Sequence, residues 1–589
     1  MKNSKKLLAY LIAAATIGAT VNVSPSLYAS ADENEYGCNM PEVSQEEMNE
    51  LKSYFASKGS SSGIQEYSTQ DLPSSVDLST SQYFPPIGDQ GSVGSCAAWA
   101  TTYYQFTFAA NKLNNITSTE STAYSPRWVY NWLNNGNPEA SNGISYANAY
   151  YLLSTLGCLT MKDCPYTKPN GEYDGSIPNN TEAMVNALKT RVTNYSNVLL
   201  RSSYDPITSP TDSDLEPVKA LLNSGHLLNV NVYWYYKTKQ TTTGEEAFYE
   251  FAKNGNLAHA LTIVGYDDNV ECDINGNGII EEGEKGAFKI ADSHGTGVHN
   301  DGFFWVMYDA LNFTSQYSNG QNRVAAFSFG TSPSGISGVD SFHYIEVENQ
   351  PVNVVALLDI NTSNIYNYIF ETTRSNYASY ASTQEKYTVY DGNKSQSTFA
   401  IANPIKSFNG VLAFDYGSLD EPASMFTSPL NYFMGLHIQK RASLGSTETI
   451  SSFKLCDNKM NTIATASRLP EIKNDEWFKS WNINLNIGDL NYDDSITADD
   501  TNMLLQILSK RINPSDLQLY LSDVNQDGSV SMVDLITLNS QLPASEQAEF
   551  LDTMKNMYNS MSIEEQIEYN SMFNELECSI ISNMNDSIE

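Results

Sequence analysis

Two acidic loops near the C-terminus repeat each other and limit what this part of the chain can fold into. Asp489 has its counterpart in Asp523, 34 residues later, and each loop leads into an apolar run with helical spacing. Such a loop wraps one calcium ion when oxygen-bearing side chains stand at positions 1, 3, 5, 9 and 12, a carbonyl at 7 and a tight turn at 6. The two loops supply Asp489, Asn491, Asp493, Ser495, Thr497 and Asp500, and Asp523, Asn525, Asp527, Ser529, Ser531 and Asp534. Residues 487–543 are therefore predicted to form a small helical module with two calcium sites.

A third loop of the same pattern lies in the middle of the chain. Its ligand positions hold Asp273, Asn275, Asn277, Glu281 and Glu284. A single loop is a weaker signal than a duplicated one, so an ordinary acidic turn is the alternative interpretation. We expect a third calcium ion at this loop.

The length and charge of the chain bound its architecture. A chain of 589 residues exceeds what one hydrophobic core serves, so several domains are expected. The net charge of −35 would repel nucleic-acid phosphates and anionic lipids, which argues against nucleic acid and membrane partners. Helical and strand patterns mix over 71–332, short strands separated by turn residues fill 338–486, and 544–589 has the pattern of acidic helices. The predicted order is an α+β domain, a β-rich domain packed as a sandwich, the calcium module and a helical tail.

The N-terminus has the pattern of an export signal. Three lysines precede an apolar run over 7–23, which ends near the small residues 29–31. We predict a cleavable signal peptide over 1–31 rather than a membrane anchor, because polar residues interrupt the run. Residues 32–70 contain one expected helix after a capping box at 44–47, and they are equally consistent with an inhibitory propeptide and with a linker. The mature chain is expected to be secreted.

Cys96 has the local sequence of an activated thiol. It follows the turn Gly91-Ser-Val-Gly-Ser95 and opens 97–113, a stretch without Pro or Gly that is compatible with one continuous helix. A cysteine at a helix N-terminus beside an imidazolium is ionised near neutral pH, because both stabilise the thiolate. The alternative is a buried, inert cysteine.

The chain has seven cysteines, an odd number, and the sequence leaves open whether Cys158 and Cys164 form a disulfide.

Several segments resemble papain-like cysteine peptidases. Leu72-Pro-Ser-Ser-Val-Asp77 is similar to the start of their mature chain, and Gln90-Gly-Ser-Val-Gly-Ser-Cys96 is similar to their nucleophile motif. The resemblance implies that Cys96 is the nucleophile and that Gln90 donates to the oxyanion together with the backbone N–H of Cys96. The apolar segment Leu257-Ala-His259-Ala-Leu is similar to the strand that carries the family's general base. The resemblance therefore assigns the base to His259.

The third member of the centre departs from the family pattern. The family carries an Asn-Ser-Trp-Gly motif, whereas this chain reads Asp292-Ser-His294-Gly295. Aspartate accepts the same hydrogen bond from an imidazole, so Asp292 is expected to orient His259. The motif lacks the tryptophan that covers this hydrogen bond in the family, which predicts a weaker or pH-shifted activity. His294 is a candidate second ionisable group. No role is assigned to the remaining histidines, His226, His299, His343 and His437.

The duplicated loops, each followed by one helix and ending in Asp, resemble a type I dockerin, the module that docks cellulosomal enzymes onto scaffoldin cohesins. The resemblance implies paired EF-hand-like calcium sites and a scaffoldin cohesin as the partner. In this family positions 10 and 11 help choose the cohesin, and they hold Ala498-Asp499 in one loop and Met532-Val533 in the other. These pairs differ chemically, so a single binding orientation is expected.

Two functions are consistent with these motifs. The first is a secreted endopeptidase that hydrolyses protein or peptide substrates with a Cys96-His259-Asp292 centre and works in a cellulosome at the cell surface. The second is a catalytically silent papain-like module that serves binding or adhesion in such a complex. The altered motif over 292–294 is the chief support for the second function.

Overall fold

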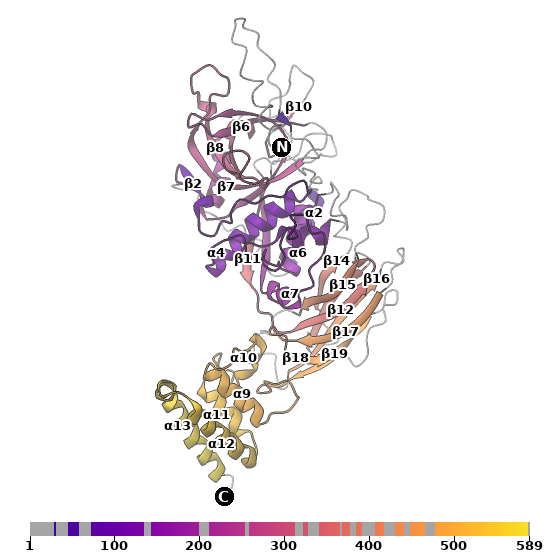
Figure 1. Ribbon diagram of the computed structural model, residues 1–589, viewed down its shortest axis with the longest axis vertical. Helices are drawn as coiled ribbons and strands as arrows, with labels where there is room; N and C mark the ends of the chain where they lie inside the picture. Colours follow the sequence, from indigo (N-terminus) through magenta and orange to yellow (C-terminus); the bar gives the residue numbers. More distant parts are fainter. Residues whose placement is uncertain are drawn as a thin grey trace.

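The computed structural model describes residues 29–30, 45–57, 72–134, 143–199, 211–253, 258–311, 322–324, 326–327, 341–365, 368–376, 385–391, 407–416, 430–440, 448–465 and 477–586. Three parts follow one another along its long axis: a mixed helix-and-sheet part, a part with two four-stranded sheets and a helical C-terminal part (Figure 1). The predicted signal peptide lies outside the described residues except for 29–30, as does most of 32–70. No described helix is long and apolar enough to cross a membrane.

The first part is built on a sheet of 11 strands among the described residues. Its order is β1-β5-β6-β9-β8-β7-β4-β11-β3, with β2 beside β7 and β10 beside β6. The strands are β1 (Ala29–Ser30), β2 (Ser75–Asp77), β3 (Thr190–Leu199), β4 (Leu228–Tyr233), β5 (Tyr235–Gln240), β6 (Glu246–Lys253), β7 (Ala258–Glu271), β8 (Lys285–Ala291), β9 (Phe303–Met307), β10 (Asn322–Val324) and β11 (Ser341–Asn349). All of β4 and the first nine residues of β7 are buried. The start of β7 is largely apolar, as in a strand covered on two faces, whereas β4 alternates apolar residues with the buried Asn229 and Asn231.

The helices of the first part lie mainly on the N-terminal side of its sequence. They are α2 (Gln45–Ser57), α3 (Cys96–Ala98), η2 (Trp99–Phe106), α4 (Thr107–Asn114), α5 (Pro126–Leu133), α6 (Tyr146–Thr155), α7 (Thr181–Ala187) and α8 (Asp212–Asn223), with short 3₁₀ turns η1 (Leu78–Thr80), η3 (Glu282–Glu284) and η4 (Tyr308–Leu311). The helix predicted after the capping box at 44–47 is α2. It packs against α6 and β3 and buries Met48, Leu51 and Phe55.

One helical stretch runs without interruption from Cys96 to Asn114, close to the predicted 97–113. Its middle section, η2, is a π-helix, and at its end the backbone N–H of Thr107 donates to the carbonyl of Thr102, five residues earlier. Asn115 ends the stretch with a φ of 51° in the left-handed region. Every residue of η2 is buried, so this helix runs through the interior of the first part.

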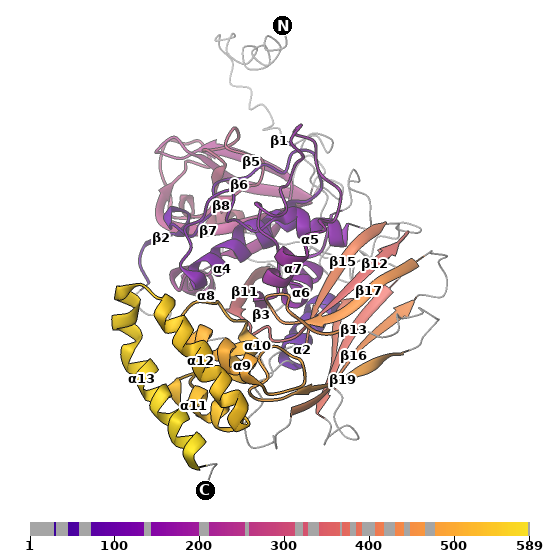
Figure 2. The ribbon, with the colours of Figure 1, turned by 60° about the horizontal axis from the view of Figure 1, so that its bottom comes forward.

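The second part consists of two antiparallel sheets, ordered β15-β12-β17-β18 and β14-β13-β16-β19 (Figure 2). Their strands are β12 (Val355–Thr362), β13 (Tyr368–Asn376), β14 (Glu385–Asp391), β15 (Phe408–Asp415), β16 (Leu430–Lys440), β17 (Glu448–Cys456), β18 (Thr462–Thr465) and β19 (Trp477–Leu485). Phe370 of one sheet stacks on Phe414 of the other, with ring centroids 5.3 Å apart. This contact supports the predicted β-sandwich, which we retain as a proposal.

The sheet of the first part extends further along the chain than the predicted boundary at 332–338. Strand β11 pairs with β3 over its whole length, and His343 pairs with Asn229 of β4. Strand β11 lies within 338–486, where the sequence predicts short strands, but a strand pattern carries no information on which sheet the strand joins. Residues up to Asn349 therefore lie in the sheet of the first part.

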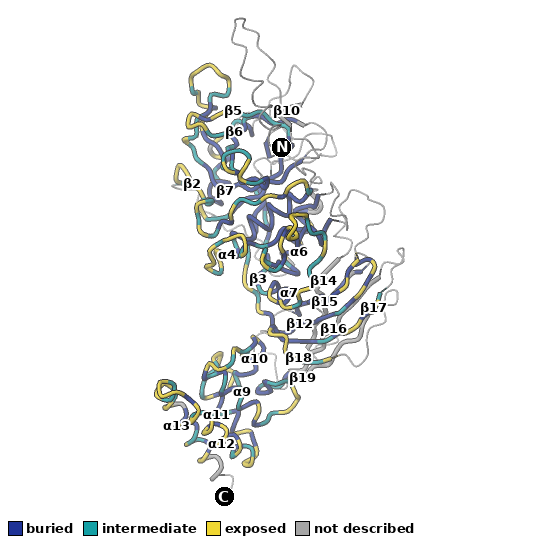
Figure 3. The backbone as a smooth tube through the Cα atoms, viewed as in Figure 1, coloured by how far each residue is buried: buried dark blue, intermediate teal, exposed yellow. Residues whose placement is uncertain are grey.

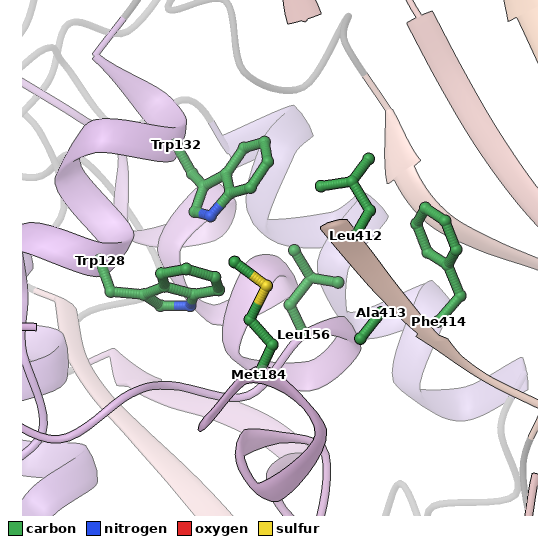
Figure 4. A pocket seen from close by; sticks show the side chains of 7 residues that line it. All are labelled: Trp128, Trp132, Leu156, Met184, Leu412, Ala413 and Phe414. Carbon is green, nitrogen blue, oxygen red and sulfur yellow. The ribbon is translucent and has the colours of Figure 1, made fainter. Parts of the chain in front are cut away.

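The first two parts share an interface of apolar and charged contacts. A small pocket lies between them (Figure 4). It is lined by Trp128, Trp132, Leu156 and Met184 from the first part and by Leu412, Ala413 and Phe414 of β15. Nearby, Arg191 Nη2 and Asp415 Oδ2 form an ion pair at 2.6 Å, in which both side chains are largely buried. Buried hydrophobic residues of the three parts belong to one continuous cluster, and buried residues occur in each part (Figure 3).

The C-terminal part contains the helices α9 (Ala498–Leu508), α10 (Asp516–Ser522), α11 (Met532–Ser540), α12 (Ala544–Ser560) and α13 (Ile563–Asp586). The predicted acidic tail forms α12 and α13. Helix α12 packs against α9, and α13 packs against α11 and α12 (Figure 2). These contacts bury Phe550, Met554 and Phe573. The tail is therefore packed onto the module that carries the duplicated loops.

Candidate active site

Cys96 is the first residue of α3 and lies at the end of the loop 88–95. It is fully buried. Tyr166 OH lies 2.6 Å from Ser95 Oγ and donates to the carbonyl of Gln90 at 3.0 Å, which fixes the loop on both sides. A Cβ at Gly88 would overlap the ring of Trp99, so only glycine lets the loop approach the helix this closely. The helix N-terminus at Cys96 favours the thiolate form of its side chain.

Gln90 connects the loop that ends at Cys96 to the segment that contains Asp292. Its backbone N–H donates to the carbonyl of Ser293 at 2.7 Å, and Ser293 Oγ donates to Gln90 Oε1 at 2.6 Å. Its side-chain Nε2 donates to the carbonyl of Val93 at 3.0 Å. The amide carries two N–H donors, and these contacts orient it within the buried loop. Gln90 is buried.

His259 lies on β7, where it pairs with Val232 of β4, and its side chain is completely buried. Helix α3 packs against β7, so the strand that carries His259 contacts the helix that begins at Cys96. His259 Nε2 donates to Asp292 Oδ1 at 2.7 Å. The other ring nitrogen, Nδ1, is buried and has no hydrogen-bond partner among the described residues. An ionised carboxylate only accepts hydrogen bonds, so the proton stays on Nε2 and Nδ1 keeps a lone pair.

Asp292 follows β8 directly and is surrounded by donors. Its Oδ1 also accepts from the backbone N–H of Ser293 at 2.7 Å, and its Oδ2 accepts from His294 Nδ1 at 2.8 Å and lies 3.5 Å from His299 Nε2. Burial acts to raise the pKa of Asp292, but the charges and hydrogen bonds of His294 and His259 outweigh it and hold the pKa well below its usual value. Asp292 is therefore a buried carboxylate that remains ionised.

The hydrogen bond between His259 and Asp292 has an aromatic cover that the motif does not predict. Trp234, between β4 and β5, lies edge-on to His259 with ring centroids 4.5 Å apart. Its centroid is also 6.4 Å from that of His294 and 6.3 Å from that of His299. Trp234 is 2% exposed, so it keeps water from this side of the imidazole. Trp234, which lies between two strands and outside the motif, thus supplies an aromatic cover that the motif lacks.

A second histidine–carboxylate pair lies next to Asp292, and sequence reasoning missed it. His299 Nδ1 donates to Glu246 Oε2 of β6 at 2.8 Å. Burial acts to lower the pKa of His299, but the hydrogen bonds and charges of Asp292 and Glu246 raise it to about 9. No motif marks either residue, because they meet only through the pairing of β6 with β9.

The other described cysteines have no comparable environment. Cys158 and Cys164 are free and buried, so the disulfide that the sequence left open is not formed. Burial raises the pKa of Cys158 well above its usual value and that of Cys164 to about 11. Both are therefore neutral thiols near neutral pH.

The three predicted calcium loops share one hydrogen-bond pattern. The carboxylate at position 1 accepts from the backbone N–H groups of positions 5 and 6, and the carboxylate at position 12 accepts from those of positions 3 and 9. The acceptors are Asp489 and Asp500, Asp523 and Asp534, and Asp273 and Glu284. Position 6 has positive φ in all three, at Asp494 (67°), Gly528 (88°) and Gly278 (81°), as the tight turn expected at this position requires.

The donor sets of these loops fit a hard divalent cation, because they consist of carboxylate, amide and hydroxyl oxygens. Burial, together with the charge of Asp500, raises the pKa of Asp489 to about 6. Two carboxylates held this close repel each other, and a divalent cation would relieve the repulsion. The first two loops lie in the helical module, and the third joins β7 to β8.

Comparisons with known proteins match two segments of the chain. A family model described as papain family cysteine protease matches residues 72–324, and one described as dockerin type I domain matches residues 487–543. The search of curated proteins found no match. The chain is similar in structure to xylellain, a cysteine protease from Xylella fastidiosa, with 19% identity, a TM-score of 0.29, and coverage of 56% of this chain and 99% of that chain. It is also similar to digestive procathepsin L 3 of Tenebrio molitor larval midgut, with 15% identity, a TM-score of 0.28, and coverage of 48% and 72%.

The two family matches agree with the motifs that begin at Leu72 and with the duplicated loops. The chain thus contains a papain-family cysteine protease domain at residues 72–324, followed by a type I dockerin domain at residues 487–543.

Proposed function

We propose that this protein is a secreted cysteine endopeptidase that hydrolyses peptide bonds in protein or peptide substrates. The observation that carries the proposal is the buried hydrogen bond from His259 Nε2 to Asp292 Oδ1 at 2.7 Å, beside the helix that begins at Cys96. It leaves His259 Nδ1 as the ring atom that can accept a proton.

In the proposed reaction, Cys96 Sγ attacks the carbonyl carbon of the scissile peptide bond, and its proton passes to His259 Nδ1. The resulting oxyanion receives hydrogen bonds from the backbone N–H of Cys96 and the side-chain amide of Gln90. His259 then gives the proton to the leaving amine, and the C–N bond breaks. Water then attacks the thioester carbonyl and gives a proton to His259. The C–S bond breaks to release the acid and the thiolate of Cys96, and the proton returns from His259 to Cys96, while Asp292 holds the ring orientation throughout.

Alkylation of Cys96 tests this proposal. At about pH 5 iodoacetamide reacts only with an activated thiolate, so rapid labelling of Cys96 is expected. Casein hydrolysis is expected to disappear in Cys96→Ala and to persist in Cys578→Ala, which replaces an exposed cysteine of α13. Casein hydrolysis at the wild-type rate in Cys96→Ala would contradict the proposal.

The second candidate function is a catalytically silent papain-like module that serves binding or adhesion. The replacement of the family's motif by Asp292-Ser-His294 favours it. The geometry around Asp292 supports the peptidase instead, because Asp292 accepts the hydrogen bond from His259 and Trp234 covers it. If folded protein shows no iodoacetamide labelling of Cys96 at about pH 5, the silent module is the correct function.

We propose that the dockerin domain binds two calcium ions and a scaffoldin cohesin, which would place the peptidase in an extracellular cellulosome. We further propose a third calcium ion at the loop from Asp273 to Glu284. This loop connects the strand of His259 to the strand that precedes Asp292, so calcium there would brace both.

The third ion can be tested in the full chain after both dockerin loops are disabled by Asp489→Ala and Asp523→Ala. A calcium chelator is expected to lower casein hydrolysis by this double variant and to have no further effect once Glu284→Gln is added. Activity of the double variant that is unaffected by the chelator would argue against calcium in the protease domain.

A further inference from the structure

A line of polar contacts runs from β6 through the site to β7. His299 Nδ1 donates to Glu246 Oε2 at 2.8 Å, and His299 Nε2 lies 3.5 Å from Asp292 Oδ2. Asp292 uses its other oxygen, Oδ1, to accept from His259 at 2.7 Å. Glu246, His299, Asp292 and His259 therefore form one series. Glu246 lies on β6 and His259 on β7, and both Asp292 and His299 lie in the segment between β8 and β9.

The backbone of His299 has a conformation that residues with a Cβ rarely adopt. Its φ is 53°, in the left-handed region. Such a conformation costs energy and persists only when the surrounding contacts hold it, and it is most frequent at functional sites. Here two carboxylates hold the imidazole, and the rings of Phe248 and Phe304 pack against it with centroids 5.5 Å and 4.9 Å away. The side chain is 10% exposed.

The groups that face His299 determine its charge. From the elements packed against it, the charged and titratable groups are Glu246 of β6, Asp292 after β8, His294 in the same loop and His259 of β7. The two carboxylates overcome the effect of burial and raise the pKa of His299 to about 9. His299 is therefore an imidazolium at neutral pH.

The charge of His299 acts on the catalytic histidine through Asp292. Burial lowers the pKa of His259, Asp292 acts to raise it, and the charges of His294 and His299 lower it further. An uncompensated buried carboxylate would shift His259 towards a permanently charged form. A cation on the far oxygen of Asp292 limits that shift while it keeps the carboxylate in place.

We propose that Glu246 and His299 form a positioning pair that balances the negative charge of Asp292 and fixes its carboxylate, so that Asp292 orients His259 as a neutral amide would. The inference rests on the proposed peptidase function. Among the described residues, the polar contacts of His299 reach Glu246 and Asp292, so both members of the pair act on His259 through Asp292. The pair gives a role to a histidine that lies outside every motif in the sequence.

The variants His299→Gln and Glu246→Gln test the proposal in the full chain. In His299→Gln, kcat at neutral pH is expected to fall about tenfold with KM unchanged, because substrate contacts are untouched. The apparent pKa of the limb of the kcat/KM profile that reports His259 is expected to rise by about one unit, because Asp292 is no longer balanced. Glu246→Gln is expected to act in the same direction with a smaller effect, since it only weakens the charge of His299.

His226→Gln is the matched control. His226 Nε2 pairs with Glu346 Oε1 at 3.1 Å in the same domain, but neither residue contacts Asp292 or His259 among the interactions of the described residues. Both kcat and the pH profile of this variant are expected to match the wild type. A shift in His226→Gln as large as in His299→Gln would overturn the proposal, because it would show a general effect of removing a histidine.

Two outcomes separate this inference from the proposed function. A wild-type protein without peptidase activity overturns the proposed function. If the wild type is active and both His299→Gln and Glu246→Gln have the same kcat and pH profile as the wild type, only the positioning pair is overturned. If His299→Gln does not fold, the nearly isosteric Glu246→Gln decides, because the Glu246 side chain is 25% exposed and tolerates the exchange. NMR titration of the six histidines adds a direct readout, and a His299 that titrates near its ordinary value also overturns the pair.

Discussion

The substitution Asp292→Asn restores the residue of the papain-like motif, yet we expect it to damage this protein. The oxygens of Asp292 accept from His259 and His294 and lie near the imidazolium of His299. Asparagine keeps one acceptor and replaces the other oxygen by an N–H donor. If its oxygen stays with His259, its N–H group faces the donors of His294 and His299. Two buried donors then lose their acceptor.

The size of the effect follows from these contacts. Each hydrogen bond to a buried charged group contributes about 1.5–3 kcal/mol, and removing one partner of a buried ion pair costs about 3–5 kcal/mol. We therefore expect the free energy of unfolding of the protease domain to fall by about 3–5 kcal/mol near pH 6. The family motif, which has asparagine at this position, would by itself predict a stable and more active Asp292→Asn variant. The contacts of Asp292 in this structure predict the opposite.

The loss also depends on pH with a definite sign. The pKa of Asp292 is held well below its usual value, so its contribution to stability is present above about pH 3.9, the unfolded pKa, and is lost only at lower pH. The pKa of His299 is raised to about 9, so its contribution is complete below about pH 6.5, its unfolded pKa, and is lost as the pH rises through 9. The difference between wild type and Asp292→Asn should be largest between about pH 4 and 6.5 and should narrow towards pH 9.

Urea unfolding followed by tryptophan fluorescence measures this difference. The tryptophans of the protease domain are Trp99, Trp128, Trp132, Trp234 and Trp305. Asp163→Asn is the control, because Asp163 accepts a hydrogen bond from neutral Thr160 at 3.0 Å and should change the midpoint little. A variant as stable as the wild type near pH 6, or a difference that grows towards pH 9, would refute the reasoning.

Three further predictions concern other contacts. Trp234→Ala removes the cover of His259 and should lower the free energy of unfolding by about 3–5 kcal/mol and reduce kcat more than KM, whereas Trp234→Phe should retain most of both in urea titrations and steady-state kinetics. A chain that ends at residue 543 loses the buried contacts of Phe550 and its neighbours, so calorimetry should show a dockerin less stable by at least about 3 kcal/mol. Asp499→Ala and Val533→Ala should weaken cohesin binding unequally in calorimetric titration, and equal losses would contradict a single orientation.

The local parts of the site could be predicted from the sequence. A long run without Pro or Gly predicted the helix that begins at Cys96, and the resemblance of the segment around His259 to the family's base-carrying strand implied the strand β7. The same is true of the duplicated loops, where the spacing of the ligand residues fixes the turn, including the positive φ of Asp494. In these segments the residues that determine the structure are neighbours in sequence, so a pattern within about 12 residues is sufficient.

The parts that depend on pairing between distant strands could not be predicted. Glu246 reaches His299 because β6 runs parallel to β9, and Trp234 reaches His259 because it follows the strand that pairs with β7. Strand β11 shows the same limit, since its sequence identifies a strand but not the sheet that it joins. Alternation within a strand states which face is buried and nothing about its neighbours.

This chain has an aspartate, Asp292, where the family motif has an asparagine. That replacement explains why His294, His299 and Glu246 are gathered around position 292. A lone buried carboxylate beside His259 would carry a large desolvation cost, which proteins meet only with paired charges and hydrogen bonds. His294 and His299 supply the donors, and Glu246 keeps His299 protonated. The left-handed φ of His299 is then an energetic cost that these contacts offset, because it aims the imidazole at both carboxylates. The aspartate at position 292 therefore requires the compensating residues His294, His299 and Glu246. Replacing Asp292 alone, or one of its partners alone, should lower both stability and activity.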